Sequence, residues 1–483
     1  MTHSASTAES ALPPLVPGPH RKRLGLISII ACFGGLLFGY DTGVSNGAER
    51  PMQAELGLSD LSVGVVISSL IFAAAVGALV GGQISDAWGR RKTIILLAVL
   101  FFVGTLFVVF SPGFGVLVTG RIMLGLAVGG ASTVVPVYLA ELAPYEIRGS
   151  ITGRNELAIV VGQLAAFVVN AIIGTVFGHI DGVWRFMFAV CALPAIALFF
   201  GMLRMPESPR WLVEKGRDDE ALVVLKTVRS EDRAVAEWEQ VERVVEEEHE
   251  EHWEGLGAIL RSKWLIRIIL VGIGISMTQQ LTGINSIMYY GQRVLIESGF
   301  GEGAAMIANV APGVFSVIGG IIALYNMDRL DRRKTFVIGL SLTTICHCLI
   351  GVASMLLPVG NAARPWIILI LVSAFVFSMQ TFLNIAVWVW LAEIFPLHMR
   401  GLGIGIAVFF GWTTNGFLAL YFPSLVEGIG ITGAFFMFAA IGVIALVFVI
   451  TQVPETRNRS LESLEEDVET GAIFNIRKAS RVH

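Results

Sequence analysis

The sequence predicts an all-α membrane protein with twelve transmembrane helices in two pseudo-symmetric six-helix bundles, joined by short cytoplasmic helices. Three observations lead to this prediction. Of the 483 residues, 54% are hydrophobic and only 15% are charged, a composition that excludes a soluble globular protein. The charges are spaced so that long apolar stretches remain between them, and motifs of the first half recur in the second.

A helix that crosses the bilayer core needs about 20 residues with almost no ionised side chain. Twelve stretches meet this requirement, and the first and the fourth contain one charge each, Asp41 and Arg121. We expect spans over residues 24–47, 61–85, 93–111, 114–140, 157–180, 186–203, 268–292, 303–327, 335–357, 365–392, 401–426 and 428–453.

The partner that this composition implies is the lipid bilayer. The formal net charge is −4 and no basic face stands out, so nucleic acid is not an expected partner. The four cysteines lie inside apolar stretches, where they indicate no disulfide framework, and no set of metal ligands is expected. We expect the chain to work as a monomer.

Basic residues are concentrated on one side of the predicted membrane topology. Arg90–Arg91–Lys92, Arg332–Arg333–Lys334 and the long polar segment after the sixth span all fall on the same side as the N-terminus. The positive-inside rule then places both termini in the cytoplasm of a cell (plasma) membrane protein. The expected parts are an N-terminal tail (1–23), a first bundle (24–204), a helical linker (205–263), a second bundle (264–453) and a C-terminal tail (454–483).

Three motifs occur twice in the same order. DAWGRRK at 86–92 recurs as DRLDRRK at 328–334, ELAPYEIRG at 141–149 as EIFPLHMRG at 393–401, and PESPRW at 206–211 in shortened form as PETR at 454–457. The near-constant offset indicates a duplicated six-helix unit. Two such halves around a midplane site are the architecture of alternating-access carriers.

These residues resemble the sugar porters of the major facilitator superfamily along essentially the whole chain. The resemblance is carried by GLLFGYD at 35–41, GRRK at 89–92, PESPRWL at 206–212, QQLTGIN at 279–285 and PETR at 454–457. The wider context at 129–138 and 154–163 is most similar to the myo-inositol/proton symporters of actinobacteria. The resemblance implies the major facilitator fold and the import of a neutral polyol or sugar.

Asp41 and Arg121 are expected to be partners, because a charge inside the bilayer usually has an opposite charge nearby. Counted from the predicted span ends, both lie about 10 Å below the same membrane surface at 1.5 Å per residue. Pairing favours the ionised carboxylate and burial without a cation favours the protonated acid, so helix movement can load and release a proton. The resemblance also implies that Asp41 is the proton site, with the proton as the coupling ion and no other cofactor. A purely structural ion pair is the alternative.

A neutral, hydroxyl-rich substrate needs amide donors and acceptors and an apolar surface. Polar side chains within the spans include Glu156, Gln163 and Asn170 at seven-residue intervals, and Gly283 can break the seventh helix so that Gln280 and Asn285 face one cavity. Such amides also serve as contacts between helices. The resemblance assigns substrate contacts to Gln163, Gln279, Gln280, Asn285, Trp388 and Asn415. Phe38, Tyr40 and Tyr289 are further candidates for the wall of the site.

Two departures from the family pattern bear on the substrate. Asn384 begins a segment that usually reads Gly-Pro-x-x-Trp, and Gly411 stands where a glutamine usually lies beside Trp412. We expect the missing side chain at Gly411 to widen the pocket and to leave room for a cyclitol.

Charges at the cytoplasmic helix ends are expected to form a gate. Acidic residues occur among the basic ones, which topology alone does not require. Scattered surface ion pairs are the alternative. The expected gate residues are Arg90, Arg91, Glu141, Arg148, Glu207 and Arg210 in the first half, and Arg332, Arg333, Glu393, Arg400 and Glu455 in the second.

The leading functional hypothesis is therefore a secondary active transporter for a polyol, most specifically myo-inositol, driven by proton symport. A hexose or pentose proton symporter and an uncoupled sugar facilitator remain alternatives within the same class. A membrane enzyme would need a nucleophile or a phosphate-binding loop that the sequence does not offer, and a nutrient receptor would usually need a longer cytoplasmic tail.

Overall fold

The chain is almost entirely helical. The computed structural model describes residues 12–250, 262–326, 329–396, 399–457, 464, 467–468 and 470–474, and no strand occurs in these ranges. The helices are α1 (Pro19–Leu56), α2 (Asp60–Trp88), α3 (Arg90–Val109), α4 (Phe114–Leu142), η1 (Tyr145–Ile147), α5 (Arg148–Phe177), α6 (Val183–Ala189), α7 (Ala192–Leu203), α8 (Pro209–Glu214), α9 (Asp218–Val228), α10 (Glu231–Glu250), α12 (Lys263–Leu281), α13 (Ile284–Ser298), α14 (Glu302–Ala308), α15 (Val310–Asn326), α16 (Arg332–Leu356), α17 (Arg364–Ser378), η2 (Met379–Asn384), α18 (Ile385–Ile394), α19 (Arg400–Gln452) and η4 (Ala472–Phe474).

Eleven helical segments in the described ranges are long and apolar enough to cross a membrane. The last of them, Leu402–Gln452, contains 51 residues and would extend about 75 Å at 1.5 Å per residue, more than twice the hydrocarbon thickness of about 30 Å. Its backbone leaves the helical conformation at Gly430 (φ 67°, ψ 176°), so this segment consists of two spans. The predicted all-α membrane fold is confirmed, and the described ranges contain twelve candidate spans once the last segment is divided at Gly430.

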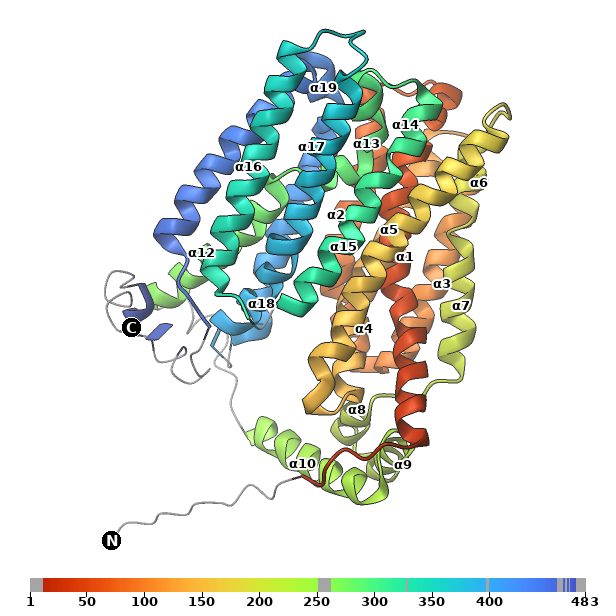
Figure 1. Cartoon of the computed structure of the whole chain (residues 1–483). Coiled ribbons are helices and arrows are strands. Elements are labelled where there is room, and N and C mark those ends of the chain that lie inside the picture. Colours follow the sequence, from red (N-terminus) through yellow and green to blue (C-terminus); the bar gives the residue numbers. More distant parts are fainter. Residues whose placement is uncertain are drawn as a thin grey trace.

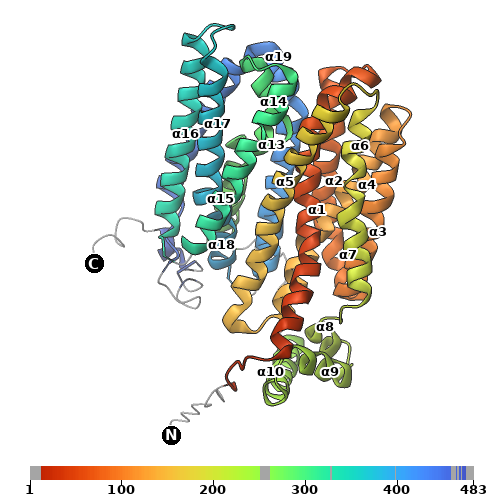
Figure 2. The same ribbon diagram turned by 45° about the vertical axis from the view of Figure 1, so that its right-hand side comes forward.

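The helices form two halves, α1–α7 and α12–α19, which lie side by side in Figures 1 and 2. The short helices α8–α10 lie below the first half, at the end of the bundle where α1 begins (Figure 2). We call this end the terminal end, because α1 starts there at Pro19 and α19 finishes there at Gln452, and we call the opposite end the distal end.

Glycines set the distance between α1 and α5. Gly35, Gly39, Gly43 and Gly47 recur at four-residue intervals and all face α5. A Cβ atom at Gly39 would lie only 1.8 Å from the carbonyl oxygen of Ile159, so any side chain there would push the helices apart. Small residues of this kind allow close helix packing where lipid removes the hydrophobic driving force.

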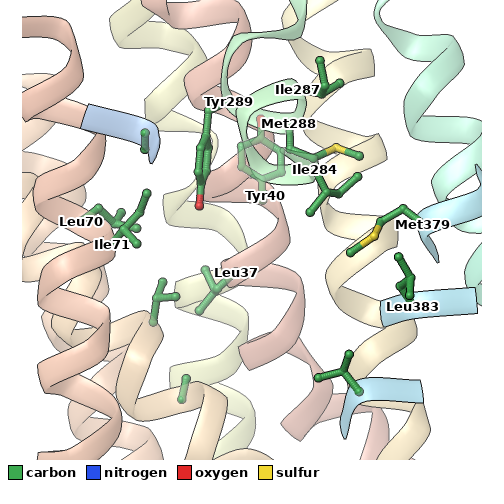
Figure 3. Packing of buried hydrophobic residues seen from close by; sticks show 14 of the residues in the cluster. Leu37, Tyr40, Leu70, Ile71, Ile284, Ile287, Met288, Tyr289, Met379 and Leu383 are labelled. Carbon is green, nitrogen blue, oxygen red and sulfur yellow. The ribbon is translucent and has the colours of Figure 1, made fainter. Parts of the chain in front are cut away.

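The two halves meet through α2 with α19, α5 with α15 and α1 with α13. At Gly64 of α2 the backbone of α19 comes so close that a Cβ atom would lie 2.0 Å from the carbonyl oxygen of Leu420. Figure 3 shows buried apolar side chains from both halves in this region, namely Leu37, Tyr40, Leu70, Ile71, Ile284, Ile287, Met288, Tyr289, Met379 and Leu383.

Several predicted helix ends need correction. The fifth span was expected to begin at residue 157, yet α5 begins at Arg148. The first span was expected to stop at residue 47, yet α1 continues to Leu56, and the seventh was expected to stop at 292, yet α13 continues to Ser298. In both cases the predicted span ends just before charged residues. The structure instead buries Glu49 and Arg293 inside the helical bundle. The expected tails and the end of the linker lie partly outside the described residues, which omit 1–11, 251–261 and most of 458–483.

Candidate functional site

Asp41 and Arg121 lie together in the interior of the first half. Nη1 of Arg121 on α4 donates to Oδ1 of Asp41 on α1 at 2.9 Å, and each side chain is only 1% exposed. The guanidinium also donates to Oγ of Ser45 at 3.1 Å and to the carbonyl oxygen of Val66 at 3.3 Å. The other carboxylate oxygen of Asp41, Oδ2, is buried and has no hydrogen-bond partner among the described residues.

The surroundings of this pair are largely apolar. The guanidinium carbon of Arg121 lies over the ring of Phe188 on α6, 5.6 Å from the ring centroid. Tyr40 and Leu70 are buried in the same apolar cluster as Phe188. A charge in such surroundings is stable only while its partner remains, because unpaired burial favours the neutral form. The arrangement can therefore couple the position of Arg121 to the protonation of Asp41.

A network of side-chain amides surrounds the break between α12 and α13. Gly283 adopts a left-handed conformation (φ 80°), which ends α12 and starts α13 at Ile284, as the sequence predicts. Across this break Nδ2 of Asn285 donates to Oε1 of Gln280 at 2.7 Å, and Gln280 in turn approaches Oε1 of Gln279 at 3.4 Å. The break thus brings together amides that a straight helix would separate.

The network continues to the tenth span. Gln279 donates to Oδ1 of Asn384 at 2.9 Å. Asn384 ends η2, a π-helical turn between α17 and α18, and such turns frequently occur at functional sites. The asparagine that replaces the usual glycine of this segment is therefore a member of the amide network.

Aromatic residues contact one another between the two halves. The rings of Phe38 on α1 and Trp412 on α19 have centroids 5.4 Å apart and connect the two halves. One turn beyond Trp412, Asn415 donates to the hydroxyl of buried Tyr289 at 3.5 Å. Phe38 and Trp412 therefore connect α1 with α19, and Tyr289 and Asn415 connect α13 with α19.

Gln163 lies on the opposite side of this region, where α5 packs against α1. Its backbone lies against Gly39 and Gly43, and its Oε1 is buried without a hydrogen-bond partner among the described residues. Asn170, two helical turns further along α5, instead donates to the carbonyl oxygens of Gly43 and Val44 at 3.2 Å each. Asn170 therefore joins helices, whereas Gln163 keeps an acceptor available.

Trp388 differs from the other predicted contacts because its side chain is 39% exposed. It lies on α18, two residues before Trp390, which is fully buried.

The expectation that Gly411 widens the pocket is wrong. A Cβ atom at Gly411 would lie 2.3 Å from Oγ of Ser276 on α12. The space that a side chain would occupy is therefore filled by a neighbouring helix. The glycine allows α12 and α19 to pack closely, and it removes a polar group without leaving a hollow.

The predicted gate charges form two equivalent clusters, one in each half. Arg90 makes two hydrogen bonds to Glu141 at 3.0 Å, and Arg332 pairs with Glu393 at 2.9 Å. The carboxylate of Glu207 accepts from the backbone N–H of Arg91 at the start of α3, and Glu455 accepts in the same way from Arg332 and Arg333 at the start of α16. A carboxylate at a helix N-terminus is favourable because it binds the free N–H groups and opposes the helix dipole.

The remaining gate residues make other contacts. Arg91 donates to the carbonyl oxygen of Leu203, Arg210 pairs with Glu214 at 3.3 Å, and Arg148 is exposed. The side chain of Arg400 lies outside the described part of the chain. In this conformation the Arg90–Glu141 and Arg332–Glu393 pairs each join helices of the same half, which differs from the closure between halves that the sequence analysis expects.

One group of buried charges was missed by the sequence analysis. At the distal end, Glu49 and Asp60 of the first half lie against Arg293 of the second. The available signal was the position of Glu49, eight residues beyond Asp41 and thus about two turns further on the same helix.

The sequence matches the family model "Sugar (and other) transporter" over residues 27–468. It is 47% identical over 452 residues to the major myo-inositol transporter IolT of Bacillus subtilis (strain 168), covering 93% of this chain and 95% of IolT. It is 36% identical to the glucose transporter GlcP of Staphylococcus epidermidis, covering 92% of this chain and 98% of GlcP.

The structure is similar to solved structures of the xylose transporter XylE from E. coli. The inward open conformation gives a TM-score of 0.79 at 27% identity and covers 92% of this chain and 99% of that chain. XylE described as a proton:xylose symporter and bound to 6-bromo-6-deoxy-D-glucose gives a TM-score of 0.75 at 28% identity, with 92% and 99% covered.

Proposed function

Because this chain belongs to the sugar transporter family of the major facilitator superfamily, we propose that it is a secondary active transporter that imports myo-inositol together with protons. One observation carries the proposal above all: a carboxylate buried in the membrane part, Asp41, is paired on one oxygen with Arg121 and free on the other. Asp41 lies on α1 between Gly39 and Gly43, the two glycines that pack against Gln163.

The polyol specificity rests on the chemistry of the site and on similarity. Gln163, Gln280 and Asn285 supply donors and acceptors, and they carry no net charge that would attract an ionised substrate. Phe38 and Trp412 supply the apolar surface on which the carbon face of a ring can pack. The identity to IolT, a myo-inositol transporter, is higher than that to the glucose transporter GlcP.

The proposed cycle follows from the Asp41–Arg121 pair. When Arg121 withdraws, Asp41 loses its only paired charge in the described surroundings and takes up a proton, which keeps it neutral while the halves move. When Arg121 returns, the proton leaves on the side to which the site is then open. Each proton that enters down a membrane potential of 100 mV supplies about 2.3 kcal/mol, which sustains a substrate gradient of roughly fifty-fold.

We place the terminal end in the cytoplasm of a plasma-membrane protein, on the basis of the positive-inside rule. There the Arg90–Glu141 and Arg332–Glu393 clusters hold the helix ends of each half as rigid units. When the carrier opens to the outside, these charged rims approach each other and form the cytoplasmic gate together with Arg148, Arg210 and Arg400.

Uptake of radiolabelled myo-inositol into proteoliposomes, with and without an imposed pH gradient, tests this function. Accumulation above the external concentration is expected only with the gradient (acid outside), and protein-free liposomes serve as the control. Equal uptake with and without the gradient would point to a facilitator. Excess unlabelled glucose that abolishes uptake would favour the hexose transporter suggested by the similarity to GlcP.

A further inference from the structure

Three charged side chains from both halves meet at the distal end of the bundle. Nη1 of Arg293 on α13 lies 3.3 Å from Oε1 of Glu49 on α1, and Nη2 of Arg293 donates to Oδ1 of Asp60 at the start of α2. The side chain of Glu49 is fully buried, that of Arg293 is 9% exposed and that of Asp60 is 17% exposed. These ion pairs therefore connect the halves largely out of contact with water.

Neighbouring contacts also join α1 and α13. Nδ2 of Asn46 donates to the carbonyl oxygen of Met288 at 2.8 Å, and its Oδ1 accepts from the backbone N–H of Gln292 at 2.8 Å. These two hydrogen bonds satisfy backbone groups beside Tyr290, where α13 departs from helical geometry (φ −126°). The more exposed pair of Arg50 and Glu297, at 3.8 Å, lies further out between the same helices.

Opening the distal end would separate α13 from α1 and α2. Glu49 has no hydrogen-bond partner for either carboxylate oxygen among the described residues, so its stability depends on the nearby positive charge. Removing the partner of a buried charge is strongly unfavourable, because the remaining charge must be neutralised or hydrated. The cluster thus opposes separation of the halves at this end, whereas Arg90–Glu141 and Arg332–Glu393 at the terminal end do not join the halves.

We propose that Glu49, Asp60 and Arg293 form a latch that holds the distal end closed and thereby sets the balance between the inward-facing and outward-facing states. Arg293 is a positioning residue: it acts through α13, which carries Tyr289 one turn and Asn285 two turns before it. The inference rests on the proposed transport function, because only a carrier that alternates between two states needs such a balance.

Distances between two spin labels, measured by double electron–electron resonance, test the latch without any transport assay. Spin labels attached at Ala54→Cys on α1 and Ala304→Cys on α14, both exposed, report the separation of the halves at the distal end. The background carries Cys348→Ser because Cys348 is the exposed native cysteine among the described residues. The wild-type latch is expected to give mainly the shorter distance.

Arg293→Ala is expected to raise the population with the longer distance about tenfold or more, within the usual range of coupling energies. The isosteric Glu49→Gln should also raise the population with the longer distance. This second variant tests the latch if Arg293→Ala does not fold. Arg185→Ala is the matched control, because Arg185 pairs with Glu55 at 2.8 Å within the first half.

Distances unchanged in both Arg293→Ala and Glu49→Gln would overturn the latch, as would an equal shift in Arg185→Ala. The substrate plays no part in this readout. A carrier that fails to transport myo-inositol can therefore still confirm the latch, and an unchanged distance leaves the transport proposal standing.

Discussion

Asp41 can hold a proton because its two carboxylate oxygens have different surroundings. Oδ1 accepts from Arg121, whereas Oδ2 is buried without a partner in the described part of the chain. The pairing is predictable from sequence, because each charge interrupts a span that is otherwise uncharged. Glu49 and Arg293 are not predictable in the same way, since charges that end an apolar stretch normally mark the end of a helix.

Gln280 is the amide whose loss should affect the substrate most directly, because it links Asn285 and Gln279 across the helix break. Gln280→Ala is expected to raise the Kd for myo-inositol about tenfold, as the loss of a hydrogen bond worth about 1.4 kcal/mol requires. Isothermal titration of the purified protein measures this change. Asn170→Ala is the control, since that residue bonds the backbone of α1, and it should lower the melting temperature without changing Kd by more than about twofold. An unchanged Kd in Gln280→Ala would remove this residue from the site.

Asp331 should give a pH-dependent contribution to stability. Nζ of Lys334 donates to its Oδ2 at 2.6 Å and Nη1 of Arg457 to its Oδ1 at 3.0 Å, and these hydrogen bonds lower the pKa of Asp331 below its ordinary value of 3.8. A lowered pKa means that the stabilisation is fully present above about pH 4 and is lost as the pH falls through the folded-state value. Because the pair is partly exposed, it contributes less than about 1 kcal/mol.

Thermal unfolding in detergent at several pH values measures this effect. Wild type and Asp331→Asn should differ by a small, constant amount between pH 5 and pH 7, and the difference should shrink as the pH falls below about 4. A difference that does not shrink at all on acidification would show that Asp331 acts by packing and not through its charge.

At the scale of helices, close packing is set at small residues, and sequence alone gives no distance for them. Gly411 illustrates this limit: the missing side chain suggests a wider pocket, yet Ser276 of α12 fills the space. The break at Gly283 is predictable, because the polar residues on its two sides would otherwise point apart. The length of α1 is not predictable, because Glu49 is buried by a partner 244 residues away in the chain.

Gly411→Gln, which restores the residue usual in the family, should therefore destabilise the protein. The new Cβ atom would lie 2.3 Å from Oγ of Ser276, so the serine hydroxyl must rotate away or α12 and α19 must move apart. Overpacking of this kind costs about 1–3 kcal/mol. Gly411→Ala alone should lower the melting temperature. Combining it with Ser276→Gly, which removes the clashing hydroxyl, should recover most of that loss. Equal melting temperatures for Gly411→Gln and wild type would contradict the close packing.

At the scale of the whole molecule, the duplication extends from sequence to detailed contacts. Tyr138 on α4 donates to the carbonyl oxygen of Pro206 at 2.8 Å, and the corresponding Trp390 on α18 donates to that of Pro454 at 3.1 Å. The repeated motifs predict this two-half architecture, because each motif serves its own half. The charges that join the halves, Glu49, Asp60 and Arg293, have no repeated counterpart in the motifs and become visible only in the folded structure.

The proposed proton symport depends on proton exchange at Asp41. The variant Asp41→Asn, assayed in proteoliposomes, tests this exchange most directly. The variant keeps the size of the side chain but cannot carry a negative charge. It should retain exchange of labelled for unlabelled myo-inositol and lose all accumulation under an imposed pH gradient, whereas Asp181→Asn, an exposed control, should accumulate like wild type. Accumulation by Asp41→Asn to the wild-type level would contradict the proposed coupling.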